Sequence, residues 1–198
     1  MKRNGVLTLL LLGGWTLTAL AGDPRTGREK AAPCAACHGE KGEGTSPLFP
    51  RLAGQHERYL IRQLRDFKNG RRPDPTMGAI ASQLSDRDIQ DLAAYFASLP
   101  PVGGGGEGSE AGWVLFRRGV VERKVPACTG CHGPEGQGNA PAGFPRLQGQ
   151  YAAYLVKTLK DFAEAKRGKA GGAMAQIASR LTEEEIKAVA AYLQSLKP

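Results

Sequence analysis

The chain contains the same five-residue pattern twice, and this pattern constrains its fold and chemistry more than any other feature. Cys34-Ala35-Ala36-Cys37-His38 recurs as Cys128-Thr129-Gly130-Cys131-His132, and the two motifs use all four cysteines of the sequence. A Cys-x-x-Cys-His motif attaches a c-type haem, because its two thiols bond the porphyrin vinyl groups and its imidazole lies beneath the iron. A redox dithiol, a structural disulfide or half a zinc site does not require the histidine. We therefore predict two covalent haem c groups, held by Cys34, Cys37, Cys128 and Cys131.

The first 21 residues have the pattern of a secretory signal peptide. Lys2 and Arg3 precede an apolar run that starts at Val6, and small residues end the segment at Ala21. The apolar part is shorter than the roughly 20 residues that a membrane-spanning helix needs. We expect cleavage after Ala21 and export of the mature chain.

The charge of the mature chain is mildly basic. Without residues 1–21 there remain 25 basic and 19 acidic residues, so the formal charge falls from +8 to +6. Basic and acidic residues are interleaved and aromatic residues are sparse, so we expect no nucleic-acid partner. Residues 22–101 contribute +2 (12 − 10) and residues 102–198 contribute +4 (13 − 9). A weak preference for an acidic partner face is therefore expected, more from the second half.

Beyond the motifs, the mature chain is one unit repeated. Phe-Pro-Arg-Leu at 49–52 returns 95 positions later at 144–147, and Ile-Ala-Ser at 80–82 returns 97 positions later at 177–179. Between the copies, two prolines and four consecutive glycines interrupt any helix and predict a linker. We predict a cleaved signal peptide at 1–21, domains at 22–99 and 110–198, and a linker at 100–109.

The spacing of apolar residues is helical throughout, and no segment alternates with the period of a strand. An all-α protein is therefore expected, with shorter helices near 25–32 and 110–122 before the motifs. Ser85 with Asp88, and Thr182 with Glu185, match the capping box that begins a helix. The predicted core positions are Leu60, Leu64, Phe67, Ile89, Leu92, Ala93, Phe96 and Leu99, and in the second repeat Leu155, Leu159, Phe162, Ile186, Val189, Ala190, Leu193 and Leu196.

The second ligand of each iron decides between electron transfer and chemistry at an open iron. After Met1 the chain has only Met77 and Met174, which lie 97 positions apart in Pro-rich or Gly-rich loops before the last helix of each repeat. A single loop methionine is usually a flexible apolar filler, but duplication in register with the haem motif favours ligation. We predict His38 with Met77 and His132 with Met174 as axial ligands.

The other candidate imidazole is His56, whose counterpart in the second repeat is Tyr151. Because the two repeats do not share it, we interpret His56 as a helix-start or surface residue. Tyr95 and Tyr192 are better explained by aromatic packing in the last helices, with a hydroxyl partner near the haem left open.

Together, the two motifs, the Phe-Pro-Arg-Leu loops, the paired methionines and the final Tyr-Phe-Ala-Ser-Leu and Tyr-Leu-Gln-Ser-Leu helices resemble the cytochrome c4 family over essentially the whole mature chain. The resemblance implies two tandem class I cytochrome c domains about a pseudo-twofold axis, in the periplasm of a Gram-negative bacterium. It also implies an electron carrier between redox protein partners, with a bc1-type donor and a terminal oxidase acceptor, and no small-molecule substrate.

Two other functions remain open on the sequence. One is a dihaem electron-transfer subunit of a flavocytochrome or another dehydrogenase, which would have the same motifs. The other is a dihaem peroxidase, which needs one open or His-ligated iron and is disfavoured by the symmetric methionines. Peripheral association with a membrane surface is also left open.

Overall fold

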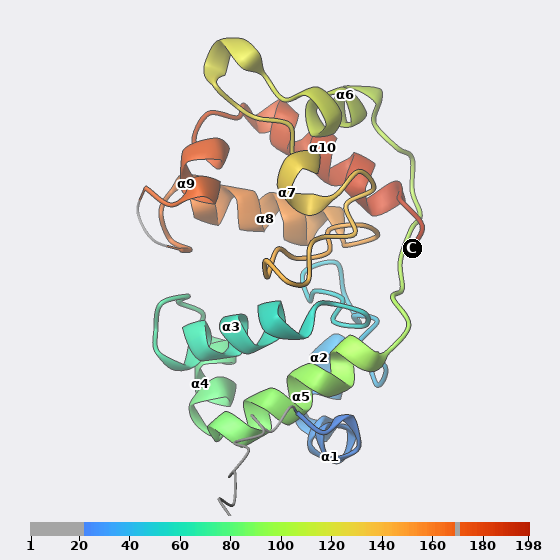
Figure 1. Cartoon of the computed structure of the whole chain (residues 1–198), viewed down its shortest axis with the longest axis vertical. Coiled ribbons are helices and arrows are strands. Elements are labelled where there is room, and N and C mark those ends of the chain that lie inside the picture. Colours follow the sequence, from blue (N-terminus) through green and yellow to red (C-terminus); the bar gives the residue numbers. More distant parts are fainter. Residues whose placement is uncertain (1–21, 169–170) are drawn as a thin grey trace, which may run out of the picture.

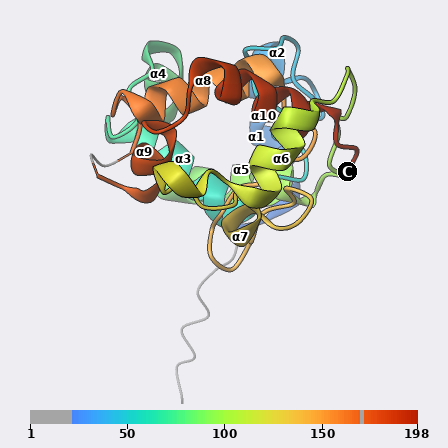
Figure 2. The same cartoon turned by 90° about the horizontal axis from the view of Figure 1, so that it is seen from above.

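The computed structural model describes residues 22–168 and 171–198, so the predicted signal peptide at 1–21 lies outside the described residues. Two helical domains are stacked along the long axis and joined by an extended segment on one side (Figure 1). Viewed from above, the second domain overlies the first (Figure 2). The first domain contains α1 (Pro24–Lys30), α2 (Ala32–His38), α3 (Glu57–Lys68), α4 (Pro75–Ser82) and α5 (Asp86–Ser98). The second contains α6 (Glu110–Arg118), the 3-10 turn η1 (Val121–Arg123), α7 (Thr129–His132), α8 (Ala152–Ala163), α9 (Ala173–Ala178) and α10 (Glu183–Ser195).

The secondary structure confirms the all-α prediction. Across the described ranges there is no β-strand, only two isolated bridges that pair Val120 with Val125 and Asn139 with Phe144. Residues 99–109 between α5 and α6 form no helix. None of the helices described is both long and apolar enough to cross a lipid bilayer.

Each domain has its own apolar core, formed by the inner faces of its helices. The buried residues of the predicted stripes are Leu60, Ile89, Leu92, Ala93 and Phe96 in the first domain and Leu155, Ile186, Val189, Ala190 and Leu193 in the second. The remaining predicted positions are half-buried: Leu64, Phe67, Leu99, Leu159, Phe162 and Leu196. The helical spacing therefore identified both cores.

Capping boxes fix the starts of the two long C-terminal helices. Ser85 Oγ accepts the Asp88 N–H at 3.1 Å, and the Asp88 carboxylate accepts the Ser85 N–H at 2.9 Å. Thr182 and Glu185 exchange the same two bonds at 3.2 and 2.8 Å. Both predicted helix starts are confirmed, since each box satisfies two backbone N–H groups that a helix start leaves free.

Two glycines allow the first helix of each domain to cross the last. A Cβ on Gly27 would lie 2.0 Å from the Asp91 carbonyl oxygen, and a Cβ on Gly112 would lie 2.1 Å from that of Ala188. Only glycine permits such a close backbone approach. The two helix crossings are therefore equivalent features of the two domains.

The helices before the motifs differ from the prediction at their ends. The segment expected as one helix at 25–32 is interrupted at Ala31, where α1 ends and α2 begins. The helix expected to reach residue 122 ends at Arg118, because Gly119 follows with φ of 68°, a left-handed conformation that ends helices.

The domains meet through a reciprocal set of hydrogen bonds. The Gln55 side chain accepts the Arg146 N–H and donates to the Arg146 carbonyl, both at 2.9 Å. Gln150 makes the same two bonds with Arg51, both at 3.0 Å. Because each of these residues lies 95 positions from its counterpart, the contacts exchange under the pseudo-twofold relation between the domains. The two glutamines are 6% exposed, so the interface is closed to solvent at this point.

Candidate functional site

Each Cys-x-x-Cys-His motif forms a helical turn that packs against the core of its own domain. The first motif makes up the last five residues of α2, and the second begins at Cys128, the N-cap of α7. Cys34 and Cys128 pack against the two apolar cores, whereas Cys131 is exposed. All four thiols are free of disulfides in the structure. The helical turn therefore orders each motif without a cross-link between its cysteines.

The environment of the cysteines argues against the other readings of the motif. Burial raises the pKa of the Cys34 thiol and raises that of Cys128 to about 11. A redox-active dithiol needs the opposite, a lowered thiol pKa that supplies the thiolate. Among the described residues, no group of three or more His, Cys, Asp or Glu side chains is arranged to hold a metal ion. The raised pKa values of Cys34 and Cys128 therefore argue against the dithiol reading.

The two motif histidines are oriented in the same way. His38 Nδ1 donates to the Pro50 carbonyl at 2.9 Å, and His132 Nδ1 donates to the Pro145 carbonyl at 3.1 Å. Each histidine is 8% exposed. Neither Nε2 makes a hydrogen bond within the described residues. A carbonyl that holds Nδ1–H leaves Nε2 unprotonated and able to bind iron.

Burial also keeps these rings neutral. It lowers the pKa of His38 and of His132, and the hydrogen bonds to the proline carbonyls only partly oppose this shift. A neutral imidazole keeps the lone pair that coordination uses. The Pro of the Phe-Pro-Arg-Leu loop therefore has a role that the sequence did not reveal, which is to position the histidine.

Both methionines lie in the first turn of a short helix, and not in a loop as predicted. Met77 is the third residue of α4, where its N–H is bonded to Asp74 Oδ1 at 2.9 Å. Met174 is the second residue of α9, whose N-cap Gly172 offers no side chain. Both are half-buried. The two equivalent methionines are thus held by helices that begin differently.

His56 is not the surface residue that the sequence suggested. It stands at the N-cap of α3, as expected, but its Nε2 is bonded to the Gln137 carbonyl of the other domain at 2.9 Å. Tyr151, its counterpart, donates to the Gly44 carbonyl at 3.1 Å. Both residues are therefore interdomain contacts.

The comparisons with known proteins agree with this geometry. The sequence matches the cytochrome c family over residues 26–100 and again over 115–197, so each half contains one complete motif and one methionine. It is 46% identical to cytochrome c4 of Pseudomonas aeruginosa, over 99% of this chain and all of that protein. The crystal structure of reduced recombinant cytochrome c4 from Pseudomonas stutzeri superimposes with a TM-score of 0.84 at 43% identity, covering 89% of this chain and all of that one.

The chain belongs to the cytochrome c4 family. It is therefore an electron carrier with two covalent haem c groups, and not an enzyme. A further relative, 39% identical over 85% of this chain and 82% of its own length, is the thiosulfate dehydrogenase electron acceptor of Thiomonas intermedia.

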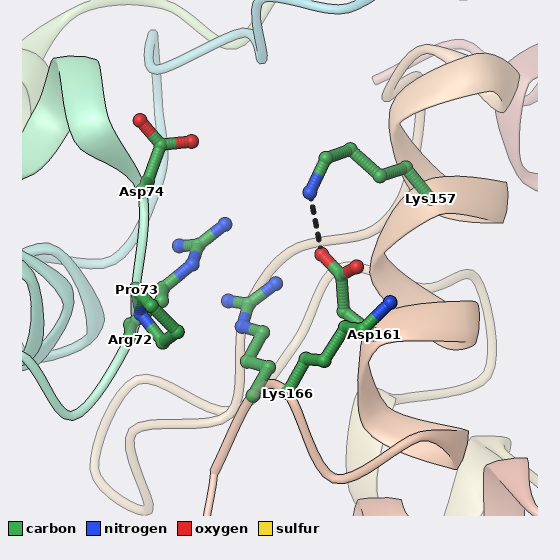
Figure 3. A pocket seen from close by; sticks show the side chains of 7 residues that line it. Arg72, Pro73, Asp74, Lys157, Asp161 and Lys166 are labelled. Carbon is green, nitrogen blue, oxygen red and sulfur yellow. Dashed lines mark hydrogen bonds and ion pairs between the residues drawn. The ribbon is translucent and has the colours of Figure 1, made fainter.

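A polar cavity adjoins the chain segments that lead to the two methionines. Its volume is about 440 Å³ (Figure 3). One wall is formed by the segment before α4 and the other by α8 and the segment before α9. The lining residues are Arg72, Pro73, Asp74, Lys157, Asp161, Lys166 and Arg167. Four cations and two carboxylates leave a positive surplus in the cavity.

Arg167 indicates what this cavity can accept. It is 5% exposed, and its guanidinium donates to Tyr59 Oη at 2.6 Å, to Gln63 Oε1 at 2.6 Å and to Thr158 Oγ1 at 3.2 Å. Within the part of the chain described, no carboxylate pairs with it. A buried cation without a counter-ion is unfavourable, and a haem brings two carboxylates. The residues present therefore fit the propionates of a bound haem.

The counterpart Arg72 completes this interdomain cluster. It donates to Gln63 Oε1 at 2.8 Å and to Tyr154 Oη at 2.9 Å in the other domain. Burial opposes ionisation of Tyr154, but the charges of Arg72 and Arg167 lower its pKa to about 7. The sequence signal for this cluster is the 95-residue repeat of Tyr59 as Tyr154 and of Arg72 as Arg167.

Proposed function

We propose that His38 and Met77 are the axial ligands of the first haem iron, and that His132 and Met174 are those of the second. Cys34 and Cys37, and likewise Cys128 and Cys131, would form the thioether bonds. The observation that carries this proposal is the pair of buried histidines with Nδ1 bonded to a proline carbonyl and Nε2 free. The duplicated methionine in each domain supplies the second ligand.

When bound, the haems supply a one-electron iron couple with ligands that suit both oxidation states. The chain's own task is to prevent rearrangement when the charge changes. The Pro50 and Pro145 carbonyls hold the imidazoles in one orientation, and burial keeps these rings neutral. A thioether ligand and an apolar surrounding raise the reduction potential, which suits a donor to oxidases.

We infer that the chain works in the periplasm, where it would accept electrons from a bc1-type complex and pass them to a terminal oxidase. The signal-peptide pattern at 1–21 and the family membership support this placement. The test is the rate at which purified bc1 complex with quinol reduces the oxidised protein. A rate no faster than that with quinol alone would exclude the bc1 complex as the donor.

A second partner assignment is favoured by one comparison. The similarity to the Thiomonas electron acceptor supports a role as acceptor for a periplasmic dehydrogenase. Thiosulfate with a purified thiosulfate dehydrogenase should then reduce the protein faster than either component alone. Comparing this rate with that of the bc1 complex, at equal protein concentration, decides which donor is used.

The ligand assignment is tested by mass and spectrum together. The exported protein should have the mass of the chain plus two covalent haems. His38→Ala and His132→Ala should each leave one low-spin haem and convert the other to a high-spin form. A variant that keeps two low-spin haems would exclude its histidine as a ligand.

A further inference from the structure

The second domain has an insertion that the first domain lacks. From the equivalent helix-crossing glycines to the first cysteine of each motif there are seven residues in the first domain, Gly27 to Cys34, and sixteen in the second, Gly112 to Cys128. The nine additional residues lie within the segment 117–127, which we call the strap. The strap forms the end of the second domain that is farthest from the first domain (Figure 1).

The base of the strap is firmly anchored. Val120 and Val125 pair through backbone bonds of 2.8 and 2.9 Å, and Val125 is 2% exposed in the second core. Arg123 donates to the Arg180 carbonyl at 2.8 Å, and Arg180 donates to the Lys124 carbonyl at 2.9 Å. The strap therefore does not depend on a bound partner for its shape.

The strap combines one highly exposed apolar residue with a surplus of positive charge. Val121 at its tip is 80% exposed, the largest exposure among the bulky apolar residues described. The strap and its anchor contain five cations, Arg117, Arg118, Arg123, Lys124 and Arg180, against the carboxylates of Glu122 and Glu185, for a net charge of +3 (5 − 2), and Arg123 is paired with Glu185. A positive surplus on an exposed projecting segment attracts a partner face of opposite charge, and an exposed apolar side chain at its tip can be buried in that contact.

The strap is connected to both segments that carry the proposed ligands of the second iron. Its end leads directly into Cys128, whose N–H is bonded to the Phe116 carbonyl at 2.9 Å. Arg180, which donates to the Lys124 carbonyl of the strap, lies two residues after α9, the helix that contains Met174. In the first domain, Lys30 occupies the corresponding segment, but Asp88 and Asp91 neutralise it at 2.7 and 2.9 Å. In the second domain Glu185, the counterpart of Asp88, pairs in the same way with Arg123, so what the strap adds is the surplus of positive charge over its two carboxylates.

We propose that the strap is the docking surface for a redox protein with an acidic face, and that electrons pass between proteins through the second haem. This inference rests on the proposed ligand assignment only for the position of the second haem. The partner should carry carboxylates around a small apolar hollow that receives Val121. A membrane surface is disfavoured, because one exposed valine beside Glu122 offers no broad apolar face.

The test uses the dihaem protein and an acidic plastocyanin as a probe partner. Arg117→Glu with Arg118→Glu should lower the second-order rate of electron transfer at least about tenfold at low ionic strength and flatten its salt dependence. Arg25→Glu with Arg28→Glu, two exposed arginines of the first domain, makes the same change in net charge and is the control. Equal slowing in both double variants would overturn the proposal, because the effect would then follow from net charge alone.

Two further measurements separate the possible failures. Val121→Ser should weaken calorimetric binding of the probe more than Leu48→Ser, which alters another exposed apolar residue. No difference between them would contradict docking at the strap. Binding that persists without electron transfer in the wild-type protein would instead count against the ligand assignment. A third outcome would favour a membrane contact and overturn the proposal. In that case the wild-type protein binds vesicles of anionic phospholipid, Arg117→Glu with Arg118→Glu does not, and both transfer electrons to plastocyanin at the same rate.

Discussion

The two domains share a fold and a proposed iron site but differ in what surrounds the site. In the first, a buried carboxylate, Asp91, ties the N-terminal segment to α5 through Lys30 at 2.9 Å and the Asp23 N–H at 2.9 Å. In the second, the equivalent position is Ala188, and the strap occupies the space before the motif. The comparison shows that the duplicated unit keeps the motif and the methionine of each domain, whereas the segment before each motif differs: it is an anchored helix in the first domain and the projecting strap in the second.

The methionine helices differ in a second way. Asp74 caps α4 beside Met77, and Pro75 follows as the first helical residue, whereas α9 has Gly172 and no side-chain cap before Met174. A charged cap next to one proposed iron ligand and none next to the other predicts two different reduction potentials. The following experiments test this difference between the domains.

The largest effect is expected from removing one methionine at a time. Met77→Ala should open only the first haem, and Met174→Ala only the second, because each domain supplies its own ligand. The potential of the altered haem should fall by at least about 120 mV, since about 59 mV corresponds to a tenfold shift in a one-electron equilibrium. An optical redox titration measures both steps. If both potentials move together in either variant, the domains do not hold their irons independently.

The anchor of the first domain is tested by Asp91→Ala. Asp91 is 1% exposed and also pairs with Arg87 at 3.0 Å, so its loss removes the acceptor of the Asp23 N–H and one carboxylate each from the ion pairs of Lys30 and Arg87. We expect the free energy of unfolding to fall by about 2 kcal/mol. Asp86→Ala on the same helix, where the side chain is 75% exposed, should change it by less than about 0.5 kcal/mol. If the denaturant unfolding curves of the two variants overlap, Asp91 does not anchor the N-terminal segment.

The cap of the first methionine helix should have a smaller effect. Asp74→Ala removes the bond to the Met77 N–H and should cost about 1 kcal/mol of unfolding free energy. It should also bring the two reduction potentials closer, by making α4 resemble α9. Asp74→Asn keeps a capping oxygen without the charge. It is the matched control that separates the effect on unfolding free energy from the effect of the charge on the potentials. A potential gap that is the same in both variants and in the wild type would show that the cap does not separate the haems.

The smallest effect concerns pH and the interdomain contact at His56. Burial lowers the pKa of His56, and the charge of Arg146 adds to this shift, although the hydrogen bond to Gln137 opposes it. Because the unfolded state has the higher pKa, about 6.5, it takes up protons first as the pH falls. Stability is then full above about pH 6.5 and declines below it toward the folded pKa. His56→Gln should reduce the pH dependence of the thermal unfolding midpoint over this range. An unchanged pH dependence would assign it to other groups.

The sequence was sufficient for the features that repeat. The motifs, the helical stripes and the capping boxes of Ser85 and Thr182 each follow from local spacing, and the structure contains these helices and caps. The sequence identified the paired methionines but not the helices that contain them. A short helix that begins beside a proline or glycine has too few residues to show a helical spacing of apolar residues.

The contacts between domains could not be predicted, since they depend on the relative placement of two folded units. His56 had the pattern of an isolated helix-start histidine, yet it reaches Gln137, 81 positions away. The Arg72 and Arg167 cluster had a signal in the repeat, but its purpose becomes clear only when a buried guanidinium without a carboxylate is seen beside a cavity. Apolar periodicity predicts a core and says nothing about a polar interface.

The near-infrared absorption of the oxidised native protein tests whether each domain closes its iron with one histidine and one methionine. We expect a thioether-to-iron band of the intensity that two haems per chain would give, reduced by half in Met77→Ala and in Met174→Ala, and no reaction of the reduced native protein with carbon monoxide. A band of half this intensity in the native protein, or ready binding of carbon monoxide, would show that at least one iron is not closed by a methionine.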